Sequence, residues 1–255
     1  MAKVISVANQ KGGVGKTTTS VNLSACIAEK GYRVLLIDLD PQGNATSGCG
    51  INKNKLTKSV YTAIEDPTSA SDAICKTEFK NLSVLPSQMS LAGAELEMVG
   101  VENREIRLKQ AISYFVNDYD FIFIDCPPSL GLLTLNALVA SDSVLIPIQC
   151  EFYALEGLSQ LVNTIKQVNK IYNPLLKIEG VLITMFDSRL NLTVQVLSEI
   201  KRFFKDALYK TCIPRNVRLS EAPSHGIPGV YYERLCKGSR AYMKLAEEFL
   251  EREGK

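Results

Sequence analysis

The sequence predicts an α/β protein, in which helices cover both faces of a doubly wound and mostly parallel β-sheet. Short apolar runs alternate with longer stretches of helical periodicity, which is the pattern of repeated strand–helix units. Several runs are almost continuous Val, Ile and Leu, as expected for parallel strands that are buried on both faces. A glycine-rich turn connects the first apolar run to the first helical stretch.

These elements can be assigned in chain order. Strands are expected at residues 3–8, 33–38, 82–85, 121–125, 143–148 and 180–184. Helices are expected at residues 16–29, which Gly31 ends, and at 104–117, 155–171, 192–204 and 239–252. Residues 43–80 show no strand pattern and are expected to form loops and helices around the sheet. Because no repeat or Pro/Gly/Ser-rich linker interrupts the alternation, we expect one domain over residues 1–255.

The amino-acid composition limits the classes of protein to which the chain can belong. The chain is 46% hydrophobic and 22% charged, which is enough apolar material for a core. No apolar run approaches the roughly 18 residues that cross a bilayer, and the first residues lack signal-peptide anatomy. The seven cysteines are never spaced Cys-x-x-Cys and fit reduced thiols in the cytoplasm, while a single histidine, His225, argues against His-rich metal chemistry. A net charge of only +2 means that a nucleic-acid partner would need a local basic patch.

The first strand and first helix are joined by Lys11-Gly12-Gly13-Val14-Gly15-Lys16-Thr17-Thr18. Glycines let backbone N–H groups converge on phosphate oxygens, and the start of the helix adds a positive field. We expect Lys16 to lie along the β- and γ-phosphates and the Thr17 hydroxyl to bind Mg²⁺. The segment therefore predicts an ATP-binding phosphate loop that uses Mg²⁺ as its cofactor.

Acidic residues follow two of the expected strands. Asp38 and Asp40 come at the end of one apolar run, and Asp125 ends another. Because the carboxyl ends of parallel strands meet at the edge where ligands bind, these carboxylates should converge on the phosphate loop. Asp38 and Asp125 are expected near the metal ion, with water between them and it.

The loop departs from the common G-x-x-x-x-G-K-[ST] pattern, since Gln10 stands at the first glycine position and a second lysine, Lys11, follows it. This is a deviant Walker A motif, and with segments 40–47, 147–157 and 213–226 it makes the chain resemble the ParA/Soj partitioning ATPases over nearly its whole length. The resemblance implies ATP hydrolysis, a homodimer formed with ATP, and binding of double-stranded DNA of any sequence.

The same resemblance implies specific roles for single residues. Lys11 would reach the phosphates held by the partner subunit, Asp40 would position the attacking water, and Asp125 would be the Walker B acid. Pro214 and Asn216 would line the adenine pocket, although the pattern of residues 213–226 by itself predicts only a polar loop. Arg189 and Arg218 match positions that contact DNA. A ParB/Spo0J-like centromere-binding protein would stimulate hydrolysis, and the protein would associate with the nucleoid.

DNA contacts receive little support from local sequence. Further candidate phosphate contacts are Lys201, Arg202, Lys205, Lys210, Arg215, Lys237 and Arg240. Acidic residues are interspersed among them, so that ordinary solvated charges are the competing interpretation. Only a gathering of these cations on one face would produce salt-sensitive, sequence-independent binding.

Other branches of the superfamily fit the sequence less well. The phosphate loop begins within a dozen residues of Met1, which leaves no room for an N-terminal helix-turn-helix. Residues 244–253 are acidic and poorly suited to an anionic membrane, unlike the C-terminal helix of MinD, and no second cysteine accompanies Cys126 to hold an iron–sulfur cluster. A MinD-like positioning ATPase and a metabolic P-loop enzyme, such as an amide ligase or dethiobiotin-synthetase relative, remain as alternatives.

Overall fold

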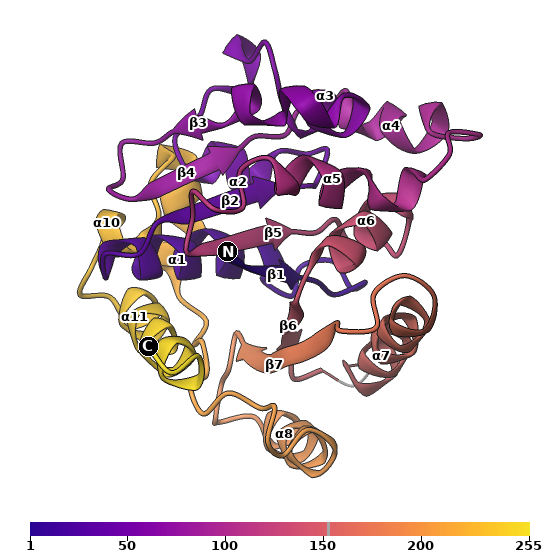
Figure 1. The fold of residues 1–255 in the computed structure, drawn as a ribbon. Coiled ribbons are helices and arrows are strands. Elements are labelled where there is room, and N and C mark those ends of the chain that lie inside the picture. The colour runs from indigo at the N-terminus through magenta and orange to yellow at the C-terminus, as the bar shows by residue number, and fades with distance from the viewer. Residues whose placement is uncertain (152–153) are drawn as a thin grey trace.

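The computed structural model describes residues 1–151 and 154–255, without the side chains of Glu95, Asn191, Leu192 and Thr193. Phe152 and Tyr153, which belong to the 147–157 segment of the family resemblance, lie outside the described residues. The described chain forms one seven-stranded sheet between two layers of helices (Figure 1). In sheet order the strands are β3 (Cys75–Lys76), β4 (Leu82–Leu85), β2 (Val34–Asp38), β5 (Phe121–Asp125), β1 (Lys3–Val7), β6 (Ser143–Gln149) and β7 (Lys177–Thr184).

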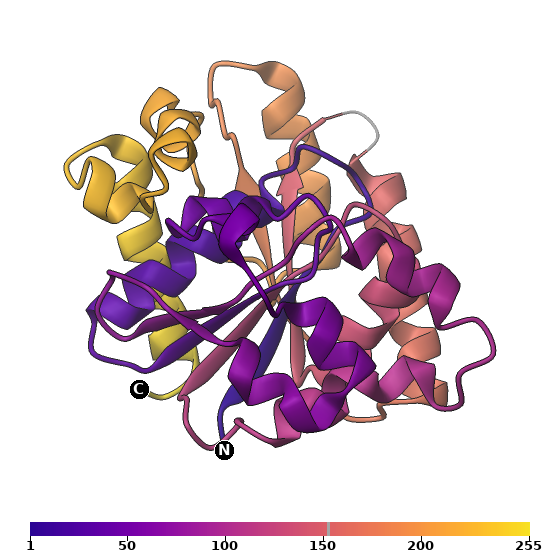
Figure 2. The ribbon, with the colours of Figure 1, turned by 90° about the horizontal axis from the view of Figure 1, so that it is seen from above.

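The sheet is buried on both faces, which explains its nearly continuous apolar strands. Successive residues of β2 alternate between two cores: Val34 and Leu36 face one, and Leu35 and Ile37 face the other. The first core holds α1 (Lys16–Glu29), α2 (Asn44–Gly48), α9 (Val217–Glu221), α10 (Gly229–Tyr232) and α11 (Lys237–Arg252). The second holds α3 (Val60–Glu65), α4 (Leu91–Glu97), α5 (Arg107–Ser113), α6 (Leu132–Ala140), α7 (Ala154–Ile171) and α8 (Asn191–Phe203). Seen from above, the strands fan out between these layers (Figure 2).

The predicted fold class is confirmed, but several elements differ from the prediction, among them α4, α9 and α10, which were not predicted, and β7, which begins at Lys177 instead of residue 180. Residues 43–80 include β3, a two-residue edge strand antiparallel to β4 that is too short to show a period of two. The helix expected at 104–117 is divided into a 3₁₀ turn, η3 (Arg104–Ile106), and α5. Helix α6 was not predicted, because LLTLNALVA is apolar almost all round and lacks helical periodicity. The remaining short turns are η1 (Lys53–Lys55), η2 (Pro67–Ala73) and η4 (Ala222–His225).

The order of the strands determines which loops lie together at the candidate site. Strand β1 lies between β5 and β6. Strands β2 to β5 lie on one side of β1 in the sheet, and β6 and β7 lie on the other side. Val7 of β1 and Asp38 of β2 both pair in register with Asp125 of β5. The loops that follow these three parallel strands therefore open at one edge, where ligands bind in open α/β sheets. Among the described helices, none is long and apolar enough to cross a membrane.

Candidate nucleotide-binding site

The phosphate loop leaves β1 and enters α1 through left-handed backbone. Gly13 has φ 74° and Gly15 has φ 86°, which favours residues without a side chain. The Thr184 hydroxyl, at the end of β7, donates to the Val14 carbonyl at 2.8 Å and holds the loop in place. The start of α1 has no side-chain cap and no acid in its first turn. Its positive end is thus available to an anion.

Lys16 lies inside this loop rather than in solvent. It is 6% exposed, and its Nζ donates to the Lys11 carbonyl at 2.9 Å. Burial lowers the pKa of the Lys16 ammonium, while the charges of Asp125, Cys126 and Asp40 act in the opposite direction. The ammonium therefore stands within the glycine-rich turn and near two of the predicted acids.

Lys11 makes a contact that the sequence did not predict. Its Nζ forms an ion pair with Glu151, which follows β6, and its backbone N–H donates to the Asn9 side chain at 3.0 Å. The two paired side chains are 38% and 44% exposed. Lys11 is accordingly held by its own subunit in this structure, and its reach toward a partner subunit stays a prediction.

Asp38 and Asp125 are neighbours on adjacent strands, and both are fully buried. Burial raises the pKa of both carboxyls. The charge of Asp38 raises the pKa of Asp125 further, and the charge of nearby Asp40 also raises the pKa of each. Thr46 of α2 donates to Asp38 Oδ2 through both its N–H and its hydroxyl, each at 2.7 Å. The Asp40 N–H donates to the other oxygen at 3.2 Å. Asp38 thus ties β2 to the loop and helix that follow it.

Asp125 has the oxygen that a metal ion would require. Its Oδ1 accepts from the Ser20 hydroxyl at 2.8 Å, but its buried Oδ2 has no hydrogen-bond partner among the described residues. The Thr17 hydroxyl lies close enough to lower the pKa of Asp125. The described residues include no group of three or more His, Cys, Asp or Glu side chains that could hold a metal. This donor set fits Mg²⁺, which takes one or two protein oxygens and completes its shell with phosphates and water.

Asp40 lies just beyond β2, at the start of a turn. Its carbonyl accepts from the N–H of Gly43 at 2.8 Å, and its Oδ1 accepts from the N–H of Gln42 at 2.9 Å. Gly43 has φ 62° and is the N-cap residue that precedes α2. The Asp40 carboxylate is partly exposed and lies on the same edge as Asp38 and Asp125. The structure therefore brings the three predicted acids together at the phosphate loop.

Pro214 and Asn216 line a cavity of about 290 Å³ that also contacts Gly15 and Thr18 of the phosphate loop. Residues 213–226 are not the plain polar loop that their pattern suggests, because α9 and η4 form there. Asn216 is the N-cap residue of α9, and its side chain accepts from the N–H of Leu219 at 3.3 Å. The position of the cavity fits the predicted adenine pocket.

Several residues at this edge of the sheet were not predicted from the sequence. Thr184 anchors the phosphate loop, and Tyr242 of α11 lines the 290 Å³ cavity and bonds Thr19 at 3.1 Å. Glu151 holds Lys11. A second cavity of about 400 Å³ is lined by Thr17 and Thr18 together with residues of α1, α2 and 222–229. No local signal identifies these residues, since they reach the loop from strands and helices far along the chain.

The two arginines predicted to contact DNA lie on neighbouring segments. Arg189 follows β7, Arg218 is in α9, and the segments are joined where the Phe186 N–H donates to the Ile213 carbonyl at 2.9 Å. Both arginines are exposed and ion-paired: Arg189 donates to both oxygens of Asp187, at 2.8 and 2.6 Å, and Arg218 pairs with Glu221 at 2.8 Å. The bonds from Arg189 lower the pKa of Asp187 to about 2.

A glycine-rich loop at a helix start, a buried lysine and three acids at two neighbouring strand ends define the class of P-loop nucleotide-binding proteins. Residues 2–178 match the family described as AAA domain. The chain is 58% identical to the sporulation initiation inhibitor protein Soj of Bacillus subtilis, covering 97% of this chain and 98% of that protein. It is 51% identical to the chromosome partitioning protein ParA of Myxococcus xanthus, covering 99% of this chain and 89% of that one. The chain belongs to the ParA/Soj family of partitioning ATPases.

Solved structures agree with this assignment. A Mycobacterium smegmatis structure named cobyrinic acid a,c-diamide synthase, with bound ATP analogue and magnesium, is 38% identical and has a TM-score of 0.87, covering 100% of this chain and 97% of that one. A putative plasmid partition protein of Borrelia burgdorferi bound to AMPPNP is 28% identical with a TM-score of 0.83, covering 99% of this chain and 100% of that one. Nucleotide with magnesium is therefore bound by proteins of this fold.

Proposed function

We propose that residues 1–255 act as one ATPase domain that partitions DNA. In this proposal, ATP and Mg²⁺ bind at the phosphate loop, two subunits close upon each other, and the closed dimer binds duplex DNA of any sequence. Hydrolysis then separates the subunits and releases the DNA, which would place the protein on the nucleoid in its ATP form. The family membership and the edge that gathers the phosphate loop, Asp38, Asp40 and Asp125 carry this proposal.

Each site residue would have a separate role in binding or hydrolysing ATP. Backbone N–H groups of the loop and the Lys16 ammonium would bind the β- and γ-phosphates. Thr17 would hold Mg²⁺ directly, and Asp38 and the unpaired Oδ2 of Asp125 would hold it through water; the ion neutralises charge on the phosphates when bound. Asp40, partly exposed at the mouth of the site, would orient the attacking water, and Pro214 and Asn216 would contact the adenine.

Dimer closure would require Lys11 to change partners. In the single subunit Lys11 pairs with Glu151, and both side chains are partly exposed. An ion pair of this kind contributes little and can be exchanged for a triphosphate, which carries more negative charge. Lys11 would then complete the nucleotide site of the other subunit, so that ATP and a second subunit are needed together.

DNA binding would depend on pairing two weak surfaces. Arg189, Arg215 and Arg218 lie on adjoining segments, and the charge of Arg215 reaches Asp187. The paired acids reduce the positive charge that one subunit offers, which predicts weak binding by a monomer. Two such surfaces on one duplex bind far more tightly through avidity. A ParB-like protein that stimulates hydrolysis would complete the cycle.

The decisive test is DNA binding as a function of nucleotide. Labelled duplexes of two unrelated sequences are titrated with the protein and ATP, ADP or no nucleotide, at two salt concentrations. We expect binding with ATP alone, no preference between the sequences, and loss of affinity in the Arg189→Glu and Arg218→Glu proteins, which still dimerise. Each lost phosphate contact should lower the slope of log K against log salt by about one. Equal affinity with ADP, or full binding by both variants, contradicts the proposal.

A second candidate is an ATP-dependent enzyme that forms amides, because the Mycobacterium smegmatis structure carries the name of a diamide synthase. Its 38% identity is lower than the 58% and 51% of the relatives named for sporulation control and partitioning. Stimulation of ATP turnover by cobyrinic acid with an ammonia donor, and not by DNA, would favour this function. A MinD-like role would instead show as ATP-dependent sedimentation with anionic liposomes.

A further inference from the structure

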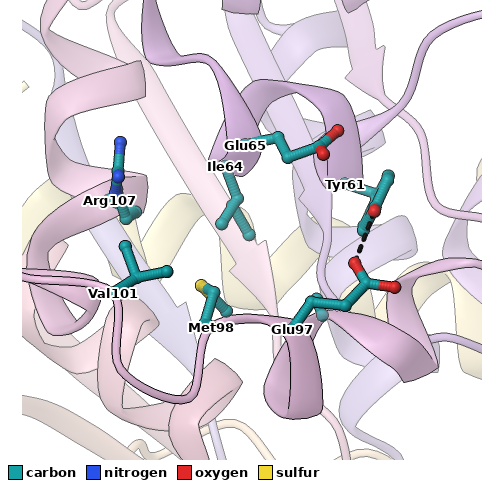
Figure 3. A pocket seen from close by; sticks show the side chains of 8 residues that line it. Tyr61, Ile64, Glu65, Glu97, Met98, Val101 and Arg107 are labelled. Atoms are coloured by element: carbon teal, nitrogen blue, oxygen red, sulfur yellow. Dashed lines mark hydrogen bonds between the residues drawn. The ribbon is translucent and has the colours of Figure 1, made fainter.

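A separate cavity of about 170 Å³ lies on the face of the sheet opposite α1. Its walls come from α3, α4 and the start of α5: Tyr61, Ile64, Glu65, Ala94, Glu97, Met98, Val101 and Arg107. Figure 3 shows the apolar side chains Ile64, Met98 and Val101 around the hollow. None of these residues belongs to the nucleotide site described above. A cavity of about 150 Å³ can hold benzene, so this one has room for one aliphatic side chain.

The charges around the cavity are arranged asymmetrically. Glu65 and Glu97 lie on the side of Tyr61, whereas Arg107 lies on the other side (Figure 3). The Tyr61 hydroxyl donates to Glu97 at 2.5 Å, and the hydrogen bond to Glu97, with Glu65 nearby, raises the pKa of Tyr61 to about 12. Within the described part of the chain, neither glutamate forms an ion pair. Two exposed carboxylates without an ion-pair partner in the described chain thus stand together on one side of an apolar hollow.

Three large hydrophobic side chains in α4 and the residues that flank it are exposed. Met89, Leu96 and Val99 are 61%, 78% and 68% exposed, although each is a large hydrophobic side chain. They lie within residues 81–103, a stretch with three acidic residues and no Lys, Arg or His. Exposed apolar side chains are typical of protein interaction sites, and these three lie on the same stretch of chain as the cavity-lining residues Ala94, Glu97, Met98 and Val101.

We propose that this surface docks a segment of another protein in which an aliphatic side chain is flanked by lysine or arginine residues. The aliphatic side chain would fill the 170 Å³ cavity, and the cations would pair with Glu65 and Glu97. Arg107 on the far side directs the cations toward the two carboxylates. The absence of cations in residues 81–103 disfavours DNA or an anionic membrane as the occupant, because phosphates would be repelled. This inference does not depend on the proposed function.

The test uses a short labelled peptide of alternating leucine and lysine pairs, with a leucine–glutamate peptide for comparison, and measures fluorescence anisotropy. We expect the lysine peptide to bind the wild-type protein and the glutamate peptide not to bind. The Glu65→Gln/Glu97→Gln protein should bind the lysine peptide roughly tenfold more weakly or worse, because charged hydrogen bonds are lost. Leu96→Ser should weaken binding several-fold through lost apolar contact.

Matched variants control for general effects. Glu251→Gln removes one exposed carboxylate on α11, and Leu175→Ser removes a leucine that is also 78% exposed, in the turn before β7. Both should bind the peptide like wild type, and all variants should bind a fluorescent ATP analogue normally. Unchanged peptide binding by the Glu65→Gln/Glu97→Gln protein, equal weakening by Leu175→Ser, or no binding by wild type overturns the proposal. None of these outcomes would affect the partitioning function.

Discussion

The nucleotide edge and the arginine-bearing segments show two different ways of placing charge. At the nucleotide edge, Lys16, Asp38 and Asp125 are buried, and the residues that they bond lie 5, 8 and 105 positions away along the chain. On the surface, Arg189 and Arg218 are exposed, and each pairs with an acid two or three residues away. A buried charge has its chemistry set by the fold, whereas an exposed pair can change partners at little cost. In the proposed function, the first region would therefore bind ATP with Mg²⁺, and the second would pair with phosphates of any DNA sequence.

The largest effect is expected at Lys16, the buried cation of the phosphate loop. Lys16→Ala should weaken ATP binding by roughly 100-fold or more, because it deletes a charged donor to the phosphates. Titration with a fluorescent ATP analogue measures this loss, with Lys58→Ala as the control, since Lys58 pairs with Asp72 on the surface. Normal ATP affinity in the Lys16→Ala protein would show that the ammonium does not contact the nucleotide.

The next test separates binding from chemistry at the same edge. Asp40→Ala should bind ATP and dimerise but hydrolyse ATP roughly 100-fold more slowly, because the water-positioning carboxylate is gone. Phosphate release, measured beside ATP-analogue binding, distinguishes the two steps. If turnover stays near normal, Asp40 lacks this role, and Asp38, whose oxygens bond Thr46 and the Asp40 N–H, becomes the candidate.

Lys11 stands between the two regions, because it belongs to the loop but forms an exposed pair. Lys11→Ala should leave ATP bound to monomers and reduce the ATP-dependent dimer at least about tenfold, since one charged contact per site is lost. Light scattering with and without ATP gives the dimer fraction. Dimer formation and hydrolysis at wild-type levels would mean that Lys11 only pairs with Glu151.

The smallest effect is expected at the surface. Asp187→Asn should strengthen ATP-dependent DNA binding roughly two- to fivefold, because Arg189 no longer has a competing carboxylate. Asp72→Asn frees Lys58 in the same way on another part of the surface, and it should leave DNA affinity unchanged. An equal gain in the Asp72→Asn protein would indicate a response to net charge instead of a local patch.

Much of the nucleotide site could be predicted from the sequence, because the relevant signals are local. Gly13 and Gly15 adopt the left-handed backbone that a phosphate loop needs, and α1 covers the expected residues 16–29. The strand that ends at Asp125 also has the predicted bounds. The DNA-contacting and partner-subunit roles came from the family resemblance, and no local pattern distinguishes Arg189 from an ordinary surface arginine.

The sequence by itself determined the alternation of strands and helices, the phosphate loop and the acids at strand ends, because each depends on backbone conformation or periodicity within a few residues. Only the tertiary structure decided that Asp38 and Asp125 are paired in register, that Asp125 keeps an unpaired oxygen, and that Glu151 holds Lys11. It also decided how α3, α4 and α5 meet around an acidic, apolar cavity. These features depend on which distant segments pack together, and packing is set by the complementary shapes and burial of whole elements, which no local pattern encodes.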